Sequence, residues 1–261
     1  MDKLQCELCN GTEFTKTDEY FVCDFCRTKY STAQARKMMI EGTVEVAGTV
    51  QVDRGNEVAN LITLAESALA GGNASEALNY ANRALEIDVD NSQAWAFRAK
   101  AAGWSSTIKS IHFAEMLTSF NTALEKAPED NRNTLKIEWA GDMLPICVAV
   151  HNMSWKHANQ FPGVNGVWAQ HISTCNQIFS VLDVAYVWGG QRAVLENTIT
   201  MASNLIKGIK FRDARNTKKV VFLQSAFEQK MQARIDGASN EMRRFDPSYV
   251  TPKPKKQKAF F

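Results

Sequence analysis

Four of the six cysteines lie close together near the start of the chain. Cys6 and Cys9 form one C-x2-C pair, and Cys23 and Cys26 form a second pair after a gap of thirteen residues. Two thiolates on one tight turn can reach the same ion, and two such turns complete a tetrahedral four-sulfur site. A redox pair would need a single C-x2-C motif in a βαβ context, which this sequence does not offer. The pattern predicts a Zn²⁺ site, and an iron site of rubredoxin type is the alternative.

The residues around the two pairs predict a small β unit. Asn10 and Gly11 tolerate the left-handed turn of a metal knuckle. Residues 12–17 and 19–22 are typical of short strands, and residues 31–40 of a short helix. Because so small a unit buries little apolar surface, the metal should supply much of its folding energy.

Residues 1–40 as a whole resemble a transcription-factor-type zinc ribbon. They depart from its commonest version at Arg27, where a glycine often follows the last ligand. This segment holds six basic and six acidic side chains. A module that neutralises phosphates should be basic, so we expect the ribbon to be structural or to contact a protein.

A change of periodicity marks the end of the ribbon. Val44, Val46, Val50 and Val52 alternate with polar residues, which predicts a short β-hairpin connector over residues 41–55. An isolated hairpin is marginal in water. Its valine face should therefore be covered by the ribbon, by the next helices or by another chain.

Residues 56–130 contain an internal repeat with helical spacing. Residues 77–86 match residues 116–125 at an offset of 39, whereas Leu61 matches Trp95 at an offset of 34, which places a five-residue insertion near residues 104–110. The small and large side chains alternate as in two antiparallel helix pairs. The positions that carry the pattern are Leu61, Leu64, Ala65, Ala68, Ala77, Ala81 and Ala84 in the first unit, and Trp95, Ala99, Ala102, Phe120, Ala123 and Pro128 in the second.

These two units resemble the tetratricopeptide repeat (TPR), although Arg98 and the insertion depart from it. The resemblance implies a mainly α protein with an antiparallel helical array (an α-solenoid), which binds peptides or partner helices on a concave face. Trp95, Arg98 and Trp104 are the candidate contact residues. Residues 41–130 carry 13 acidic and 6 basic side chains, which favours a basic partner.

A divergent helical domain is expected over residues 131–245. We predict helices at 133–152, with a possible kink at Pro145, and at 167–188, 192–207 and 217–244, with a loop at 160–166. Because two repeats are fewer than stability normally requires, these helices should complete the array.

Two further cysteines and two histidines form a symmetric pattern in this domain. Cys147 and His151 are four residues apart, as are His171 and Cys175, and both pairs are centred on residue 161. An antiparallel helical hairpin could bring all four together as a second zinc site. The alternative is that the cysteines are small buried apolar residues and the histidines are buried and hydrogen-bonded.

The C-terminal end of the chain is basic. Residues 207–261 hold 14 basic and 5 acidic side chains, against 16 and 23 in residues 1–206, so the overall charge of +2 conceals a segregated distribution. Residues 246–261 are expected to be a basic flexible tail. The basic positions closest together are Lys207, Lys210, Arg212, Arg215, Lys218 and Lys219. They could bind nucleic acid, an anionic surface or an acidic protein.

No common catalytic motif is present in the chain. The sequence lacks Walker A, GxGxxG, GxSxG and HExxH motifs. It has no apolar stretch of membrane-spanning length and no signal peptide, so we expect a cytoplasmic protein that does not enter membranes. The preferred interpretation is a non-catalytic adaptor for a protein or peptide partner. The alternative is a nucleic-acid-associated regulator, and the segregated charge also allows self-association.

Overall fold

The computed structural model describes residues 6–9, 11–17, 20–31, 34–35 and 54–257. It divides into two compact units, Met1–Asp53 and Arg54–Phe261. The predicted valine hairpin and most of the predicted helix at 31–40 lie outside the described residues. In the described part the chain is mainly helical, with a small antiparallel sheet near the N-terminus, as the sequence predicts.

The first unit is a three-stranded antiparallel sheet in the order β1 (Phe14–Lys16), β2 (Tyr20–Cys23) and β3 (Lys29–Ser31). The sequence predicted the first two strands but not β3, whose Tyr30 pairs with Phe21. The buried core consists of Cys6, Cys23 and Tyr30, with Phe14 and Phe21 packed against it. So small an apolar core stabilises little by itself.

The second unit begins with two helical hairpins. They are formed by α2 (Arg54–Ala70) with α3 (Ala74–Ile87), and by α4 (Ser92–Trp104) with α5 (Phe113–Lys126). Asn73 and Asn91 cap α3 and α4 by accepting hydrogen bonds from backbone amides three residues later. Fully buried alanines allow the helices to approach closely, namely Ala65, Ala77, Ala81, Ala84, Ala94 and Ala99. Leu64 was predicted to lie on the inner face of α2 but is exposed, and the buried residues of that helix are Val58, Leu61, Ile62 and Ala65.

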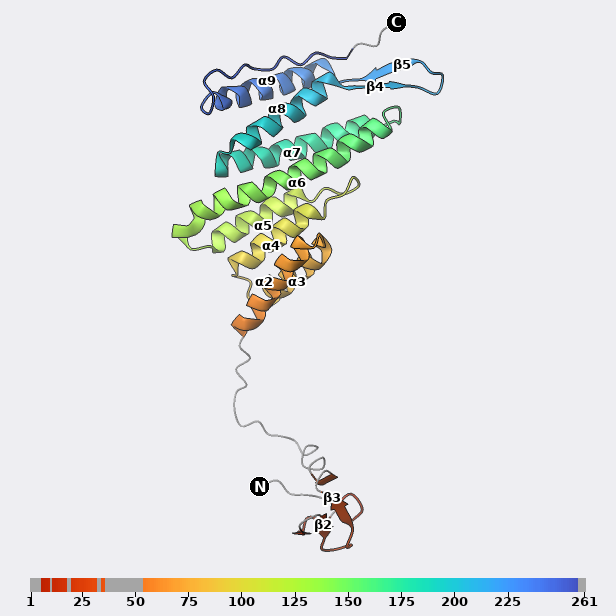
Figure 1. Cartoon of the computed structure of the whole chain (residues 1–261), viewed down its shortest axis with the longest axis vertical. Helices are drawn as coiled ribbons and strands as arrows, with labels where there is room; N and C mark the ends of the chain where they lie inside the picture. Colours follow the sequence, from red (N-terminus) through yellow and green to blue (C-terminus); the bar gives the residue numbers. More distant parts are fainter. Residues whose placement is uncertain (1–5, 10, 18–19, 32–33, 36–53, 258–261) are drawn as a thin grey trace. The chain divides into compact units, whose positions relative to one another are not determined.

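Longer helices follow in sequence order, each packed against the next (Figure 1). After a short 3-10 turn (Glu129–Asn131) come α6 (Arg132–Gln160), α7 (Val167–Gly189) and α8 (Arg192–Lys207). The α6 helix continues through Pro145 and ends eight residues beyond the predicted end. The largest buried side chains of the unit come mainly from α5, α6, α7 and α8.

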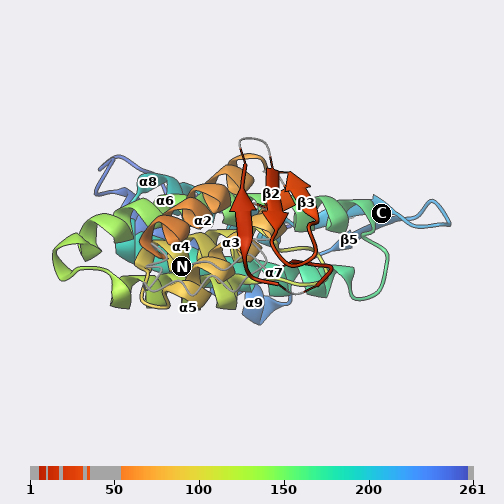
Figure 2. The same ribbon diagram turned by 90° about the horizontal axis from the view of Figure 1, so that it is seen from below.

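The prediction of one long helix over residues 217–244 is wrong at its start. A hairpin of β4 (Ile209–Arg212) and β5 (Lys218–Val221) precedes α9 (Ser225–Met242). Gly208 leaves α8 with a φ of +70°, which redirects the chain, and Asn216 takes a φ of +59° in the hairpin turn. The two strands extend beyond the neighbouring helices (Figure 2).

The C-terminal segment also differs from the expected flexible tail as far as residue 257. The Gln257 amide donates to the Lys207 carbonyl at 3.0 Å, and Arg243 donates to Thr251 Oγ1 at 2.8 Å. Lys256 forms an ion pair with Glu228 and lies over the ring of Phe222. These contacts hold the segment on the end of α8, on α9 and on Phe222, which follows β5.

Replacement of Gly208 by alanine tests the junction between α8 and the hairpin. A Cβ atom there would lie 2.1 Å from the Val221 carbonyl oxygen, and the backbone conformation is one that essentially only glycine adopts. We expect Gly208→Ala to lower the free energy of unfolding by more than about 3 kcal/mol. Gly72→Ala is the control, because Gly72 has a φ of +76° but open space around it, and should cost only about 1 kcal/mol. Equal losses in urea unfolding would contradict the clash.

Candidate functional site

The four N-terminal cysteines converge on one point in the first unit. Their sulfur atoms all lie within 4.8 Å of one another. Across the two pairs, Cys6 Sγ is 3.5 Å from Cys26 Sγ and Cys9 Sγ is 3.5 Å from Cys23 Sγ. A tetrahedral zinc–thiolate site, with bonds of about 2.3 Å, has sulfur–sulfur edges of about 3.8 Å. The arrangement can therefore hold a metal ion.

Tight backbone turns position the two pairs. The Cys6 amide donates to the Gly11 carbonyl, and the Cys23 amide donates to the Thr28 carbonyl, both at 2.9 Å. Arg27 has a left-handed φ of +62°, the conformation that favours glycine. The glycine-like turn of the ribbon resemblance is therefore present, but an arginine makes it.

Two hydroxyl groups contact the sulfurs, and no sequence motif had indicated them. The Tyr30 hydroxyl lies 3.1 Å from Cys6 Sγ, and Thr28 Oγ1 lies 3.1 Å from Cys26 Sγ. The hydrogen bond from Tyr30 lowers the pKa of the Cys6 thiol to about 6 and raises the pKa of Tyr30 to about 12. The hydrogen bond from Thr28 lowers the pKa of Cys26. Both contacts favour thiolates, which are the form that binds metal.

A second group of possible ligands lies in the interior of the helical unit. The ligand atoms of His151 on α6 and of His171 and Cys175 on α7 lie within 4.8 Å of one another. Their exposed fractions are 5%, 1% and 0%. Cys147, the fourth residue of the predicted set, is buried in the core but is not part of this group. The helical hairpin thus brings together three of the four residues.

The surroundings of this group are largely apolar. The rings of Trp155 and Trp168 lie 5.3 Å and 5.5 Å from the ring of His171. Burial lowers the pKa of His171 to about 3, so its ring is neutral at pH 7. Burial also lowers the pKa of His151 and raises the pKa of Cys175 to about 12.

A groove runs over the first helix of each hairpin and the start of α6. Its volume is about 760 Å³. We call it the α2–α4–α6 groove, and its lining residues are Glu66, Leu69, Ala70, Ser92, Gln93, Ala96, Phe97, Lys100, Trp104, Pro128, Asn131, Leu135, Glu138, Trp139 and Asp142. Its charged residues are three carboxylates and Lys100, which pairs with Asp142 at 2.7 Å. The groove is therefore net acidic.

Only one of the three predicted contact residues of the repeats lines this groove. Trp104 does so and is 46% exposed. Trp95 instead donates through Nε1 to the Val89 carbonyl, and Arg98 lies over its ring. Arg98 also binds Asn82, Ser119 and Glu115, so it connects α4 to α3 and α5. Their contacts therefore give Trp95 and Arg98 structural roles.

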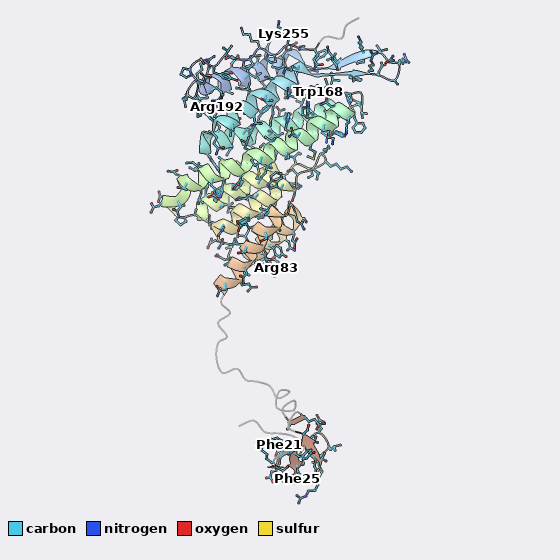
Figure 3. All side chains as sticks on the ribbon, in the orientation of Figure 1. Phe21, Phe25, Arg83, Trp168, Arg192 and Lys255 are labelled. Atoms are coloured by element: carbon cyan, nitrogen blue, oxygen red, sulfur yellow. The ribbon has the colours of Figure 1, made fainter. Side chains whose placement is uncertain are left out.

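The basic residues of the C-terminal cluster are concentrated on one hairpin. Lys210, Arg212, Lys218 and Lys219 lie on β4 and β5, with Lys207 just before and Arg215 in the turn. Arg212 is paired across the strands with Lys218, so two basic residues occupy opposite positions, and the Arg212 guanidinium donates to the Asn216 carbonyl and Oδ1 in the turn. The acidic residue of the hairpin, Asp213, accepts backbone hydrogen bonds from Arg215 and Thr217 within the turn. Figure 3 labels Lys255, which lies in the anchored C-terminal segment.

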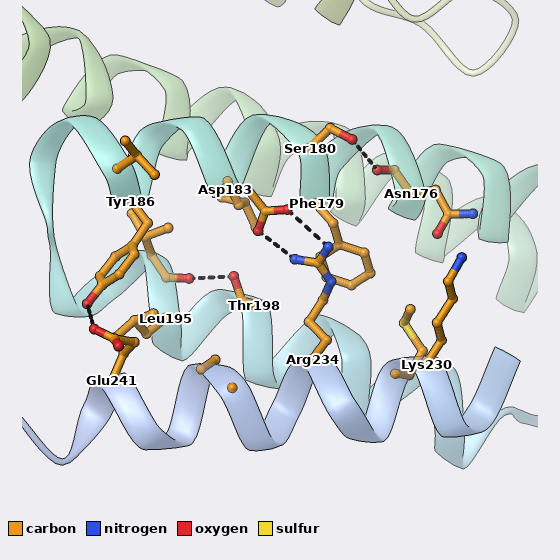
Figure 4. A pocket seen from close by; sticks show the side chains of 16 residues that line it. Asn176, Phe179, Ser180, Asp183, Tyr186, Leu195, Thr198, Lys230, Arg234 and Glu241 are labelled. Carbon is orange, nitrogen blue, oxygen red and sulfur yellow. Dashed lines mark hydrogen bonds and ion pairs between the residues drawn. The ribbon is translucent and has the colours of Figure 1, made fainter.

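A pocket of about 690 Å³ lies between α7, α8 and α9 (Figure 4). Arg234 donates to both carboxylate oxygens of Asp183, at 2.6 Å and 3.0 Å, and lies 4.6 Å from the centre of the Phe179 ring. Tyr186 donates to Glu241 at 2.8 Å. These polar groups pair with one another across the helices, which indicates a role in joining α9 to α7.

No protein-family model, curated protein or solved structure matches this chain. Among the described residues, no helix has the length and apolar character needed to cross a membrane.

Removal of metal tests the four-cysteine site. Because the first unit has only a minimal apolar core, we expect chelation, or Cys23→Ser, to unfold this unit and leave the helical unit intact. NMR should then lose the dispersed amide signals of the β1–β3 sheet, while the helical circular dichroism signal persists. Cys147→Ser is the matched control and should leave the sheet signals unchanged. Retention of the sheet after complete metal removal would show that the metal is not required.

Proposed function

We propose that this protein is a non-catalytic adaptor that binds a segment of a partner protein in the α2–α4–α6 groove. The observation that carries the proposal is the groove itself. Its surface combines exposed apolar area, such as Trp104, with carboxylates on neighbouring helices. Helical grooves of this kind bind extended or helical peptides.

The order of the helices supports a TPR-like array. α2 packs on α3, α3 on α4, and α4 on α5, while α2 and α4 also touch each other and α4 touches α6. The first helix of each hairpin thus neighbours the first helix of the next, as in helical repeats whose inner face binds ligands. In this proposal the α6–α7 hairpin serves as the third unit and completes the array.

We further propose that Zn²⁺ is the ion at the four-cysteine site and that the site is structural. Four thiolates close the coordination sphere and leave no position for a substrate. The unit then offers exposed apolar side chains for contact with a protein, including Phe25, which is 70% exposed (Figure 3).

Charge reversal in the groove tests the adaptor proposal. In Glu66→Lys with Glu138→Lys, two exposed lining carboxylates become cations, which should repel a basic partner segment. Partners captured by the full chain from a nuclease-treated native extract should be lost, with a decrease in affinity of at least tenfold for a purified partner.

The matched control is Glu86→Lys with Glu125→Lys, which makes the same charge change at exposed positions outside the groove. These variants should retain the partners. Equal capture by both double variants would contradict binding in the groove.

The alternative function is nucleic-acid binding by the β4–β5 hairpin. The observation that favours it is the pairing of Arg212 opposite Lys218, since a polyanion would relieve the repulsion between them. Only one acidic residue, Asp213, lies on the hairpin, and it is engaged by the backbone amides of the turn, so it does not offset the basic side chains.

Lys218→Glu with Lys219→Glu tests this alternative. If the hairpin binds phosphates, affinity for DNA or RNA should fall. The slope of log K against log salt should become less steep by about 0.9 for each duplex DNA phosphate that the variant no longer neutralises. Arg83→Glu with Lys136→Glu, which lie on α3 and α6, is the control of equal charge. Unchanged nucleic-acid binding in the hairpin variant would contradict the alternative.

A further inference from the structure

We propose that His151, His171 and Cys175 form a second metal site, which binds a soft transition-metal ion between α6 and α7. Two imidazoles and a thiol are strong ligands for such ions, and here they meet within 4.8 Å in the interior of the helical unit. Ligand edges in metal sites measure about 3.3–3.8 Å. Cys175 Sγ already lies 3.5 Å from His171 Nε2, so modest side-chain rotations close the remaining gap.

One polar atom of this group lacks a partner that a bound ion would supply. His151 Nε2 is buried and has no hydrogen-bond partner among the described residues. A buried polar atom without a partner is unfavourable because it has lost its contact with water, and a metal ion would remove this cost by binding the nitrogen lone pair.

Ser154 forms a hydrogen bond with one of the proposed ligands, His171. Its Oγ lies 2.8 Å from His171 Nδ1, at a buried position one helical turn after His151. A metal-ligating histidine usually engages its other ring nitrogen in such a contact, which holds the ring and selects its tautomer. His171 therefore has a supporting contact on Nδ1 and can offer Nε2 as the ligand atom.

Charge and ligand number favour Cu⁺ over Zn²⁺. Binding of Cu⁺ would displace the proton of the Cys175 thiol, and this proton leaves to the solvent. The resulting thiolate and two neutral imidazoles then balance the charge of the monovalent ion. Zn²⁺ would leave one positive charge at a site whose ligands are at most 5% exposed and lie beside Trp155 and Trp168. Zn²⁺ also prefers four ligands, whereas Cys147 lies outside the group. The expected centre is therefore a three-coordinate His₂Cys site for Cu⁺.

The experiment uses the full chain with Cys6, Cys9, Cys23 and Cys26 all replaced by serine, which removes the first site. Cu⁺ is titrated anaerobically against a chromophoric Cu⁺ chelator, and Zn²⁺ is titrated in a parallel arm. We expect one Cu⁺ per chain, with one sulfur and two nitrogen ligands in X-ray absorption at the copper edge. His171→Ala or Cys175→Ala should weaken binding by more than about 100-fold, and Ser154→Ala by about 10- to 100-fold.

Two matched controls make the result specific. Cys147→Ala removes a buried thiol on the same helix as His151, and His157→Ala removes a histidine of α6 that lies outside the group. Both should retain the ion, and circular dichroism checks that each variant is folded. Absence of Cu⁺ and Zn²⁺ binding, or binding that survives His171→Ala, would overturn the site. Tight Zn²⁺ binding with weak Cu⁺ binding would overturn the choice of ion.

Discussion

The packing of α6 against α7 fixes the position of three features of the helical unit. Two of them lie on α6 itself, and the third lies in the loop that follows it. The first turns of α6 supply Leu135, Glu138 and Trp139 to the α2–α4–α6 groove, and its second half supplies His151 and Ser154 to the buried group facing α7. The loop after its end meets the β4–β5 hairpin, where Gly163 lies close to the Phe211 ring. A shift of α6 along α7 would therefore disturb all three.

The two units use different sources of stability. The helical unit has an extensive apolar core of large side chains from α5 to α9 and small alanines between the first hairpins. The N-terminal unit has two cysteines and Tyr30 as its core, and Tyr30 is also the hydrogen-bond partner of Cys6. In that unit the side chains that form the core are also candidate metal ligands or contacts of those ligands. We therefore expect the folding of this unit to depend on its metal.

Local patterns in the sequence predicted the parts of the structure that depend on neighbouring residues. The C-x2-C spacing is such a pattern, since each turn brings its own two sulfurs together. The helical period and the alanines of the repeats are another. The β4–β5 hairpin was missed because residues 217–221 contain two lysines and two valines, which suit a strand or a helix, and only pairing with residues 209–212 decides between them. Cys147 was grouped with His151 because residues four apart lie on the same face of a helix. Cys147 nevertheless lies one turn before His151 on α6, and there its side chain is buried in the apolar core.

The acidic and basic residues of the helical unit gather on two different surfaces. The net-acidic groove lies on α2, α4 and α6, whereas the basic hairpin follows α8, and α7 lies between them in the order of packing (Figure 1). No residue that the structure describes lines both surfaces, so each would act on a ligand through its own residues. Effects of changes at the two surfaces should then add. A departure from additivity would mean that the surfaces meet, which in a chain with an acidic groove and a basic hairpin indicates contact between copies.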